Sequence, residues 1–496
     1  MDKTVEKGAH RILFINTFAF TICFACWMLN GVLVTYLVDN QIFDWSPSEI
    51  GWLMGIPVLT GAVFRLPLGV LTDKFGGRPV FGILILLAAI PMFFLSMANS
   101  YLVYAICSFG FGLTGASFAV GIAFTSYWYP KKRQGFALGV FGAGNAGAAL
   151  TTIFAPTLLN YLTNDGEFID RWHYLPKIYS AVLVVTAILF FLLVKNKKPE
   201  SSTKKFNELF TPLRNIRVWR FGLYYALVFG MFVAFSMWLI PYFINVYYLP
   251  LVTAGILAAL FSFPSGVIRV LGGWMSDKWG ARKVMYWVLG TSVVFSLMMS
   301  VPKMDISTPG NGVMAKSDGK VTFVSDTLII VGNENYPVLK KPLVSKKYIK
   351  DEFHILPVKS TWQTPAIHEG QEVKKKELLA KGETHIMFQA NVWIFAVLAI
   401  ILGSIWGIGK AAVYKHIPDY FPEEVGVVGG MVGLIGGLGG FIGPIIFGYL
   451  LELTGLWTTC WMFMLLLSSI CLFCMNKVIV KMMKREVPEL MRKMEH

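Results

Sequence analysis

The sequence predicts an all-α membrane protein, with twelve transmembrane helices in two pseudo-symmetric six-helix halves. First, 55% of the 496 residues are hydrophobic and only 15% are charged, whereas soluble proteins usually carry about 25% charged residues. Second, the mean hydropathy of +0.59 comes from apolar runs that are long enough to cross a bilayer. Third, a charged motif of the first half recurs in the second. This composition excludes a soluble enzyme.

Each apolar run is close to the length of about 20 residues that a helix needs to span the hydrocarbon core. The first run is too long for the core of a signal peptide and lacks a small-residue cleavage site, so we expect it to stay as a span. The predicted spans are 12–38, 50–71, 80–98, 102–127, 136–159, 174–194, 221–243, 254–275, 284–301, 390–413, 427–450 and 457–475.

The basic residues between the spans predict the orientation of the chain. Residues 195–220 hold eight Lys and Arg, whereas residues 39–49 hold none. Because short cytoplasmic loops are enriched in Lys and Arg, we expect a multi-pass protein of the cell inner (plasma) membrane with both termini cytoplasmic. The excess of basic over acidic residues, 44 against 29, lies between apolar runs, so the predicted partner is the lipid bilayer and not nucleic acid.

The charged motif repeats at an offset of 204 residues. Arg65, Gly69, Asp73, Lys74, Gly76 and Arg78 recur as Arg269, Gly273, Asp277, Lys278, Gly280 and Arg282. Gly76 and Gly280 allow a tight turn. Asp73 and Asp277 can accept hydrogen bonds from a helix N-terminus or a basic side chain. We expect Asp73, Arg78, Asp277 and Arg282 to form conformational-switch loops that hold one state until transport breaks it.

A second pair of motifs locates an insertion. Tyr129-Pro130 and Phe421-Pro422 recur at an offset of 292 residues. This offset exceeds the earlier one of 204 by 88, so the second half has gained 88 residues between its second and fourth helices. The polar stretch 302–389 supplies them, and its runs 321–324 and 327–331 are typical of strands. The predicted domains are therefore a first half (1–194), a central cytoplasmic loop (195–220), a second half (221–301 and 390–496) and an extracytoplasmic β-rich insertion (302–389).

Arg65 and Arg269 are the leading candidates for a binding site. Each lies inside an apolar helix, eight residues before its loop aspartate, which is roughly 12 Å along the axis. An arginine near mid-membrane costs at least about 2.5 kcal/mol, so it should face a polar cavity. The twelve spans contain no Asp or Glu to neutralise the pair. The two arginines therefore predict a cationic pocket and an anionic substrate.

Two glycine-rich helices limit the size of that substrate. Span 136–159 has glycines at 139, 142, 144 and 147, and span 427–450 has eight between 429 and 443. Small residues at this spacing let helices approach closely and leave a narrow space between them, so a thin, flat solute is expected. Both C-x-x-C pairs lie inside apolar runs, and neither a metal nor a cofactor is predicted.

The repeated loop resembles the signature of the major facilitator superfamily, and the glycine-rich helices, with Asn145 in the first, resemble its nitrate/nitrite porter (NarK-like) branch. The resemblance covers all twelve spans and leaves out the insertion. It implies that Arg65 and Arg269 clamp the anion. It also implies a surrounding set of Asn145, Phe118, Tyr225, Phe229, Gly142, Gly144, Gly433 and Gly436. A planar guanidinium suits a trigonal oxyanion because it offers paired donors.

Lys410 departs from the simplest family pattern. It lies in span 390–413, and its ammonium either snorkels towards the interface or forms a third cation with a role in coupling. We predict a nitrate/nitrite antiporter that works by alternating access as a monomer. The alternatives are a nitrate/proton symporter, an exchanger of small organic anions such as formate or oxalate, and a transporter-derived sensor that binds through the insertion.

Overall fold

The computed structural model describes residues 6, 8–198, 212–301, 304–341, 358–388, 391–421 and 425–486. Much of the predicted central loop, the ends of the predicted insertion and Pro422 lie outside the described residues. The chain forms two compact units, which we call the helical unit (Met1–Ser300 with Ala396–His496) and the β unit (Val301–Phe395).

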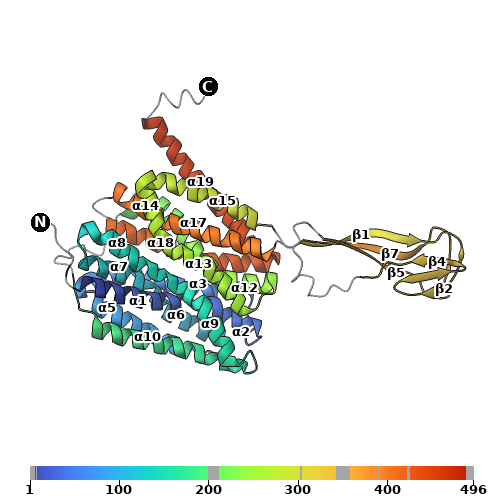
Figure 1. Ribbon diagram of the computed structural model, residues 1–496, viewed down its shortest axis with the longest axis horizontal. Helices are drawn as coiled ribbons and strands as arrows, with labels where there is room; N and C mark the ends of the chain where they lie inside the picture. The colour runs from blue at the N-terminus through green and yellow to red at the C-terminus, as the bar shows by residue number, and fades with distance from the viewer. Residues whose placement is uncertain are drawn as a thin grey trace. The chain divides into compact units, whose positions relative to one another are not determined.

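The helical unit consists of long helices that run side by side (Figure 1). The first part of the chain forms α1 (Ala9–Trp27), α2 (Asn30–Asp39), α3 (Pro47–Val63), α4 (Arg65–Phe75), α5 (Gly77–Leu95), α6 (Tyr101–Phe111), η1 (Gly112–Ala116), α7 (Ser117–Trp128), α8 (Lys131–Gly142), η2 (Ala143–Ala146), α9 (Gly147–Thr163), η3 (Ile169–His173) and α10 (Tyr174–Leu193). The second part forms α11 (Ile216–Tyr225), η5 (Ala226–Met231), α12 (Phe232–Tyr247), α13 (Leu251–Val267), α14 (Arg269–Trp279), α15 (Ala281–Met299), α17 (Val392–Tyr420), α18 (Val425–Thr454) and α19 (Thr459–Glu486).

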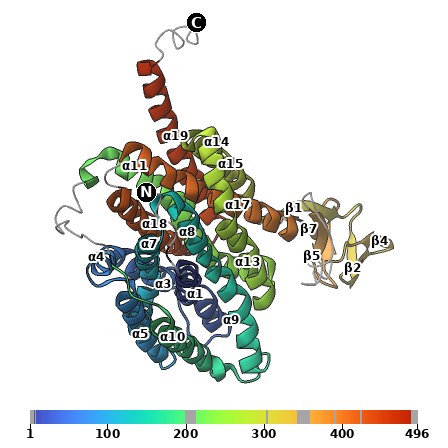
Figure 2. The same ribbon diagram turned by 60° about the vertical axis from the view of Figure 1, so that its left-hand side comes forward.

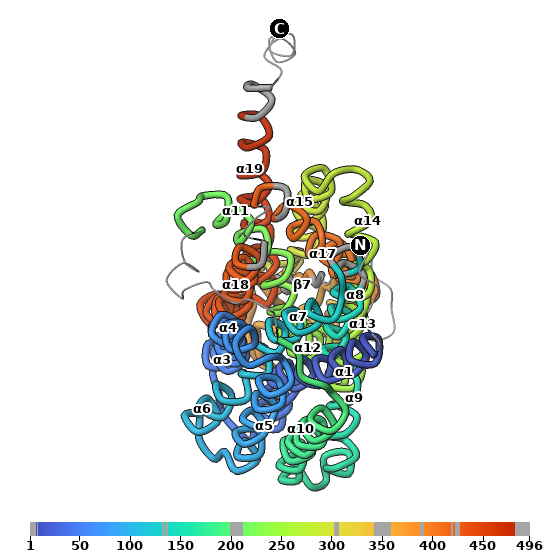
Figure 3. The backbone as a smooth tube through the Cα atoms, turned by 90° about the vertical axis from the view of Figure 1, so that its left-hand side faces the viewer, coloured from blue at the N-terminus to red at the C-terminus, as the bar shows by residue number. Residues whose placement is uncertain are grey.

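The two parts of the chain occupy different sides of the helical unit. Figures 2 and 3 show α4, α5 and α10 on one side and α14, α15 and α19 on the other. The sides meet where α3 packs on α18 and α9 packs on α13. The segment from η5 through α12 is almost completely buried, as expected for a central helix, whereas α19 is largely exposed.

Among the described residues, ten helices are long and apolar enough to cross a membrane, or up to eleven if the bent pair α13 and α14 counts as one span. The expected span 284–301 corresponds to α15, a helix of 19 residues that begins with Ala281, Arg282 and Lys283. Its basic first turn lowers its apolar character. The number twelve therefore stays a prediction.

Several helices lose regular α-helical geometry near their middle. The span from Pro47 to Phe75 is interrupted at Phe64, where Pro67 supplies no N–H for the preceding turn. The equivalent pair α13 and α14 bends by 42°. The 3₁₀ segments η1 and η2 and the π-helical segment η5 are further breaks. Such irregularities inside helices often mark functional positions.

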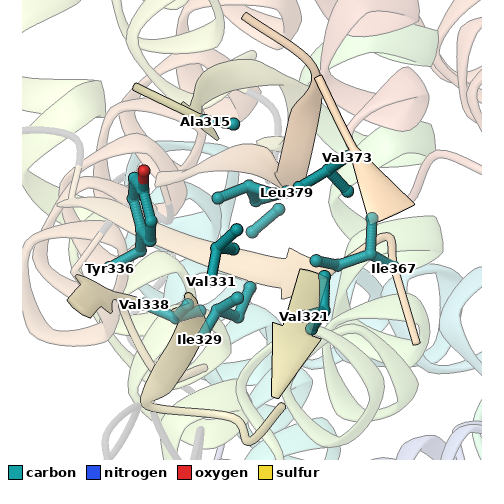
Figure 4. Packing of buried hydrophobic residues seen from close by; sticks show 10 residues of the cluster. Ala315, Val321, Ile329, Val331, Tyr336, Val338, Ile367, Val373 and Leu379 are labelled. Atoms are coloured by element: carbon teal, nitrogen blue, oxygen red, sulfur yellow. The ribbon is translucent and has the colours of Figure 1, made fainter. Parts of the chain in front are cut away.

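The β unit contains two antiparallel sheets. One sheet has the strand order β1-β7-β5 and the other β4-β3-β2-β6. The strands are β1 (Met304–Met314), β2 (Gly319–Val324), β3 (Leu328–Val331), β4 (Glu334–Pro337), β5 (Val358–Pro365), β6 (Glu372–Val373) and β7 (Leu378–Phe388). Strand β2 contains the predicted run 321–324, and β3 covers the predicted run 327–331 except for Thr327. Figure 4 shows their core, where Val321, Ile329 and Val331 pack with Tyr336 and Leu379.

Candidate functional site

Arg65 is the first residue of α4, directly after the interruption at Phe64. Its side chain is buried, with a relative exposure of 4%. Its Nη1 donates a 2.8 Å hydrogen bond to the carbonyl oxygen of Gly433. The guanidinium carbon lies 5.4 Å from the ring centre of Phe229 and 5.5 Å from that of Phe118. The structure therefore brings Arg65 together with three residues of the predicted site.

Arg269 takes the equivalent place in the second half, as the first residue of α14. Its guanidinium carbon lies 5.7 Å from the ring centre of Tyr414. A methyl group added at Gly142 would lie 3.6 Å from Arg269 Nη1, so this predicted glycine borders the arginine. The repeat places both arginines at a helix break, where the chain changes direction.

Each arginine contacts the glycine-rich helix of the opposite half. Arg65 belongs to the first half and bonds to α18, while Arg269 belongs to the second half and borders α8 at Gly142. Methyl groups added at Gly433 or Gly437 would each lie 3.7 Å from Arg65 Nη1. At these three positions the facing helix therefore presents backbone, and not a side chain, to the guanidinium groups.

The two arginines retain buried hydrogen-bond donors. Arg65 Nε and Arg269 Nη1 are buried and have no hydrogen-bond partner in the described part of the chain. Within the same residues, the ion pairs that form involve neither arginine nor Lys410. Buried polar groups are normally satisfied, and an unpaired buried cation is strongly unfavourable. This cluster therefore favours an anion that accepts hydrogen bonds.

Aromatic side chains connect the surroundings of the two arginines. Tyr225 stacks on Phe229, with ring centres 5.0 Å apart. It also meets Tyr414 edge to face at 5.0 Å. A methyl group at Gly436 would lie 2.3 Å from Tyr225 Cδ1, so Gly436 is required for this ring to approach α18. Phe229 lies in the π-helical segment η5, which directs it towards Arg65.

Lys410 does not snorkel. Its side chain is fully buried, and its Nζ donates a 3.0 Å hydrogen bond to Ser265 Oγ. The ammonium lies over the ring of Phe232 and 5.9 Å from the ring centre of Phe229. Ser265 precedes Arg269 by four residues, about one helical turn. The packing of α17 against α13 therefore holds the Lys410 side chain inside the protein, near Phe229, the ring that also lies beside Arg65.

Two predicted residues lie apart from these contacts. Asn145 is buried in η2, but it makes no hydrogen bond to Arg65 or Arg269 within the described residues. Gly144 faces α1, where an added methyl group would lie 2.4 Å from Phe20 Cδ1. In the described part of the chain, Gly144 therefore packs against α1, and Asn145 has no hydrogen bond to either arginine.

The repeated loops make specific contacts at the opposite end of α4 and α14. Gly76 and Gly280 both have positive φ values, of 88° and 87°, as a tight turn requires. Asp73 accepts a hydrogen bond from the Tyr127 hydroxyl, and Asp277 pairs with Lys415 at 2.5 Å. The basic side chain expected beside an aspartate is present in the second half, whereas a phenol takes its place in the first.

The loop arginines bind to neighbouring helices. Arg78 donates through Nη2 to the carbonyl oxygen of Phe191 at 2.5 Å, and Arg282 donates through Nη2 to Tyr420 Oη at 2.5 Å. These contacts tie each loop to the end of another helix in its own half.

Sequence reasoning missed four contributors to the cluster. Tyr414, Ser265, Phe232 and Trp27 all contact one of the three cations. Tyr414 follows Lys410 by four residues, so helical spacing would have placed both on one face of α17. We call the cluster of Arg65, Arg269, Lys410, Tyr414, Tyr225, Phe229 and Gly433 the arginine site.

The fold and this site are those expected of a membrane transporter, and comparisons with known proteins identify its family. Residues 15–323 and 382–493 match the family model of the Major Facilitator Superfamily. The chain is 35% identical to the probable nitrate/nitrite antiporter NarK1 of Thermus thermophilus, over 97% of this chain and 94% of that relative. It is 32% identical to the probable nitrate/nitrite transporter NarK2 of Mycobacterium tuberculosis (strain ATCC 25618 / H37Rv), over 56% of this chain and 69% of that protein.

Solved structures share the fold at low sequence identity. A bacterial homologue of the human lysosomal transporter Spinster, in an inward-facing and occupied conformation, has a TM-score of 0.64 at 14% identity and covers 96% of this chain and 98% of its own. The nucleoside transporter NupG has a TM-score of 0.59 at 12% identity, covering 94% of this chain and 99% of its own. The chain therefore belongs to the Major Facilitator Superfamily and, within it, to the nitrate/nitrite porter (NarK-like) family.

Proposed function

We propose that this protein exchanges nitrate for nitrite across the cell membrane, with the anion clamped between Arg65 and Arg269. The observation that carries the proposal is that a buried arginine and a half-buried one each keep a buried, unpaired donor, Arg65 Nε and Arg269 Nη1, beside the glycine-rich helix of the opposite half. Relatives named as nitrate and nitrite transporters support the choice of anion.

The chemistry of the arginine site suits a small planar anion. A guanidinium presents paired N–H donors in one plane, which match two oxygens of a trigonal oxyanion. Phe229 and Phe118 flank Arg65 and limit the space around its donors. Gly433 and Gly142 supply surfaces without side chains. These features together favour a thin oxyanion over a bulky organic one.

The charges of the site favour exchange over uptake of nitrate alone. Moving one anion inward against an interior-negative potential of 100 mV costs about 2.3 kcal/mol. Nitrate is too weak a base to carry a proton, and the twelve predicted spans hold no carboxylate. One anion in for one anion out removes the electrical cost. Without an anion, the positive charges of Arg65 and Arg269 inside the helical unit oppose reorientation of the site, so exchange is obligatory.

Glycine contacts support alternating access. At the end where α3 begins, a methyl group at Gly51 would lie 2.4 Å from the carbonyl oxygen of Pro444, and one at Gly255 would lie 2.2 Å from that of Thr152. The two halves thus touch backbone to backbone there. Towards the repeated loops, a methyl group at Gly69 or Gly139 would meet nothing within 4 Å. We take this conformation as the one that opens towards the loops, and the cycle closes that end.

The membrane topology of the chain is part of the same proposal. Twelve spans in two halves, divided by the central loop 195–220, would place both termini in the cytoplasm and the insertion 302–389 outside. Transport needs one chain, so the protein functions as a monomer.

Lys410 supports one alternative, a nitrate/proton symporter. Its ammonium is buried beside the arginines and has the neutral Ser265 hydroxyl as its hydrogen-bond partner. A lysine in such a position can exchange a proton during the cycle.

The experiment that tests the proposed function is counterflow of labelled nitrate in proteoliposomes. Vesicles loaded with unlabelled nitrate or nitrite should accumulate labelled nitrate through the purified protein. Formate-loaded vesicles serve as the control for organic anions. Counterflow with formate and none with nitrite would reject the proposed substrate, and no counterflow with any of these anions would favour a sensor.

A further inference from the structure

Tyr414 occupies a position between the two arginines that the proposed clamp does not explain. It lies on α17, one helical turn beyond Lys410, and its ring faces the Arg269 guanidinium at 5.7 Å. The edge contact to Tyr225 continues through Phe229 to Arg65. Tyr414 is therefore the link on α17 between the surroundings of Arg269 and those of Arg65.

The Tyr414 hydroxyl and Arg65 bind to the same turn of α18. Tyr414 Oη donates to the carbonyl oxygen of Gly429 at 3.2 Å, while Arg65 Nη1 donates to that of Gly433 at 2.8 Å. These carbonyls are four residues apart, which is about one turn of helix. One segment of α18 thus receives a donor from α4 and a donor from α17.

Both donors, Tyr414 Oη and Arg65 Nη1, lie close to Gly433. A methyl group added there would lie 3.1 Å from Tyr414 Oη and 3.7 Å from Arg65 Nη1. The first distance requires the tyrosine to move, whereas the second is an ordinary contact. The position of the hydroxyl is therefore sensitive to one methyl group at residue 433.

We propose that Tyr414 is a positioning residue that sets the separation of the two guanidinium groups, with its ring against Arg269 and its hydroxyl fixed on α18 beside Arg65. This inference rests on the proposed function, since it assigns a role within the anion clamp. The ring supplies a cation–π contact to Arg269. The hydroxyl binds the turn of α18 that also accepts the hydrogen bond from Arg65, and so fixes the distance between this turn and the Tyr414 ring.

The test compares the KM and maximal rate of nitrate counterflow for Tyr414→Phe, Tyr414→Leu, Gly433→Ala and the double variant Gly433→Ala/Tyr414→Phe. Phe keeps the ring and loses one hydrogen bond, so KM should rise by no more than about threefold. Leu loses the cation–π contact, so KM should rise by about tenfold or more while the maximal rate stays within about threefold. A role in folding alone would lower the maximal rate and leave KM unchanged.

Gly433→Ala provides the decisive comparison. It should raise KM because its methyl group displaces the hydroxyl, and removal of that hydroxyl in the double variant should restore KM towards the wild-type value. Gly430→Ala is the matched control on α18, because its methyl group would meet only Leu66 Cδ2, at 3.7 Å. It should transport as wild type does.

The outcomes separate this inference from the proposed function. Wild-type protein without nitrate counterflow would overturn both. Wild-type counterflow together with an unchanged KM in Tyr414→Leu, or a double variant no better than Gly433→Ala, would overturn the role of Tyr414 alone. If Tyr414→Leu does not purify as a monodisperse protein, the Gly433→Ala and double variants decide the question.

Discussion

Arg65 Nη1 donates a hydrogen bond of 2.8 Å to the carbonyl oxygen of Gly433, so a side chain of the first half binds the backbone of the second. In the proposed alternating-access cycle, α18 moves when the halves rearrange. The proposal therefore couples anion binding to the movement of α18 through the Arg65 guanidinium.

Replacement of either arginine by lysine should abolish nitrate transport. Arg65→Lys and Arg269→Lys keep the positive charge but lose the paired planar donors. Counterflow of labelled nitrate should fall to the background of empty vesicles, while both variants still insert and purify. Uptake within about threefold of wild type for both variants would show that the site lies elsewhere.

Gly51→Ala should shift the protein away from the conformation described above. Its methyl group would lie 2.4 Å from the Pro444 carbonyl oxygen, and backbone cannot yield as a side chain does. The readout is maleimide labelling of Val58→Cys, a fully buried position of α3, in a background without the six native cysteines. Labelling should be faster in Gly51→Ala.

Gly69→Ala is the matched control for that experiment, because a methyl group there meets nothing within 4 Å. It should leave the labelling of Val58→Cys unchanged. Equal labelling in both glycine variants would argue against closure through the contact of α3 and α18.

Replacement of residues 302–389 by a short Gly/Ser loop should leave nitrate counterflow intact. The two halves repeat without this segment, and the β unit has its own hydrophobic core. The measurement is counterflow by the shortened protein beside the full chain. A shortened protein that inserts and purifies as a monodisperse species but does not transport would instead indicate a gating or sensor role.

Arg65 and Arg269 could be proposed as site residues from the sequence because two independent features mark them. Their recurrence at one offset and their depth in apolar helices do not depend on side-chain packing. The pair Tyr225 and Phe229 was predicted from the family resemblance, because their helical spacing alone is also typical of core packing. The π-helical segment that contains Phe229 gave no signal in the sequence.

Lys410 shows where sequence reasoning ended. A lysine at its depth can reach the interface or stay inside, and only the packing of α17 against its neighbours determines which occurs. The Lys410 side chain stays inside because it contacts the Ser265 hydroxyl of α13 and the Phe232 ring of α12. Tyr414 was missed for the same reason. Most tyrosines in apolar helices serve in packing, and only the neighbours of Tyr414 in the structure indicate a different role.

The most direct test of the account is nitrate flux into nitrite-loaded proteoliposomes while the membrane potential and the pH gradient are varied separately. Electroneutral antiport predicts that one nitrate enters for each nitrite that leaves, at a rate insensitive to both gradients, and that nitrite-free vesicles accumulate no nitrate. Nitrate accumulation in nitrite-free vesicles, driven by an inward proton gradient and lost in Lys410→Ala, would contradict the antiporter and establish proton symport.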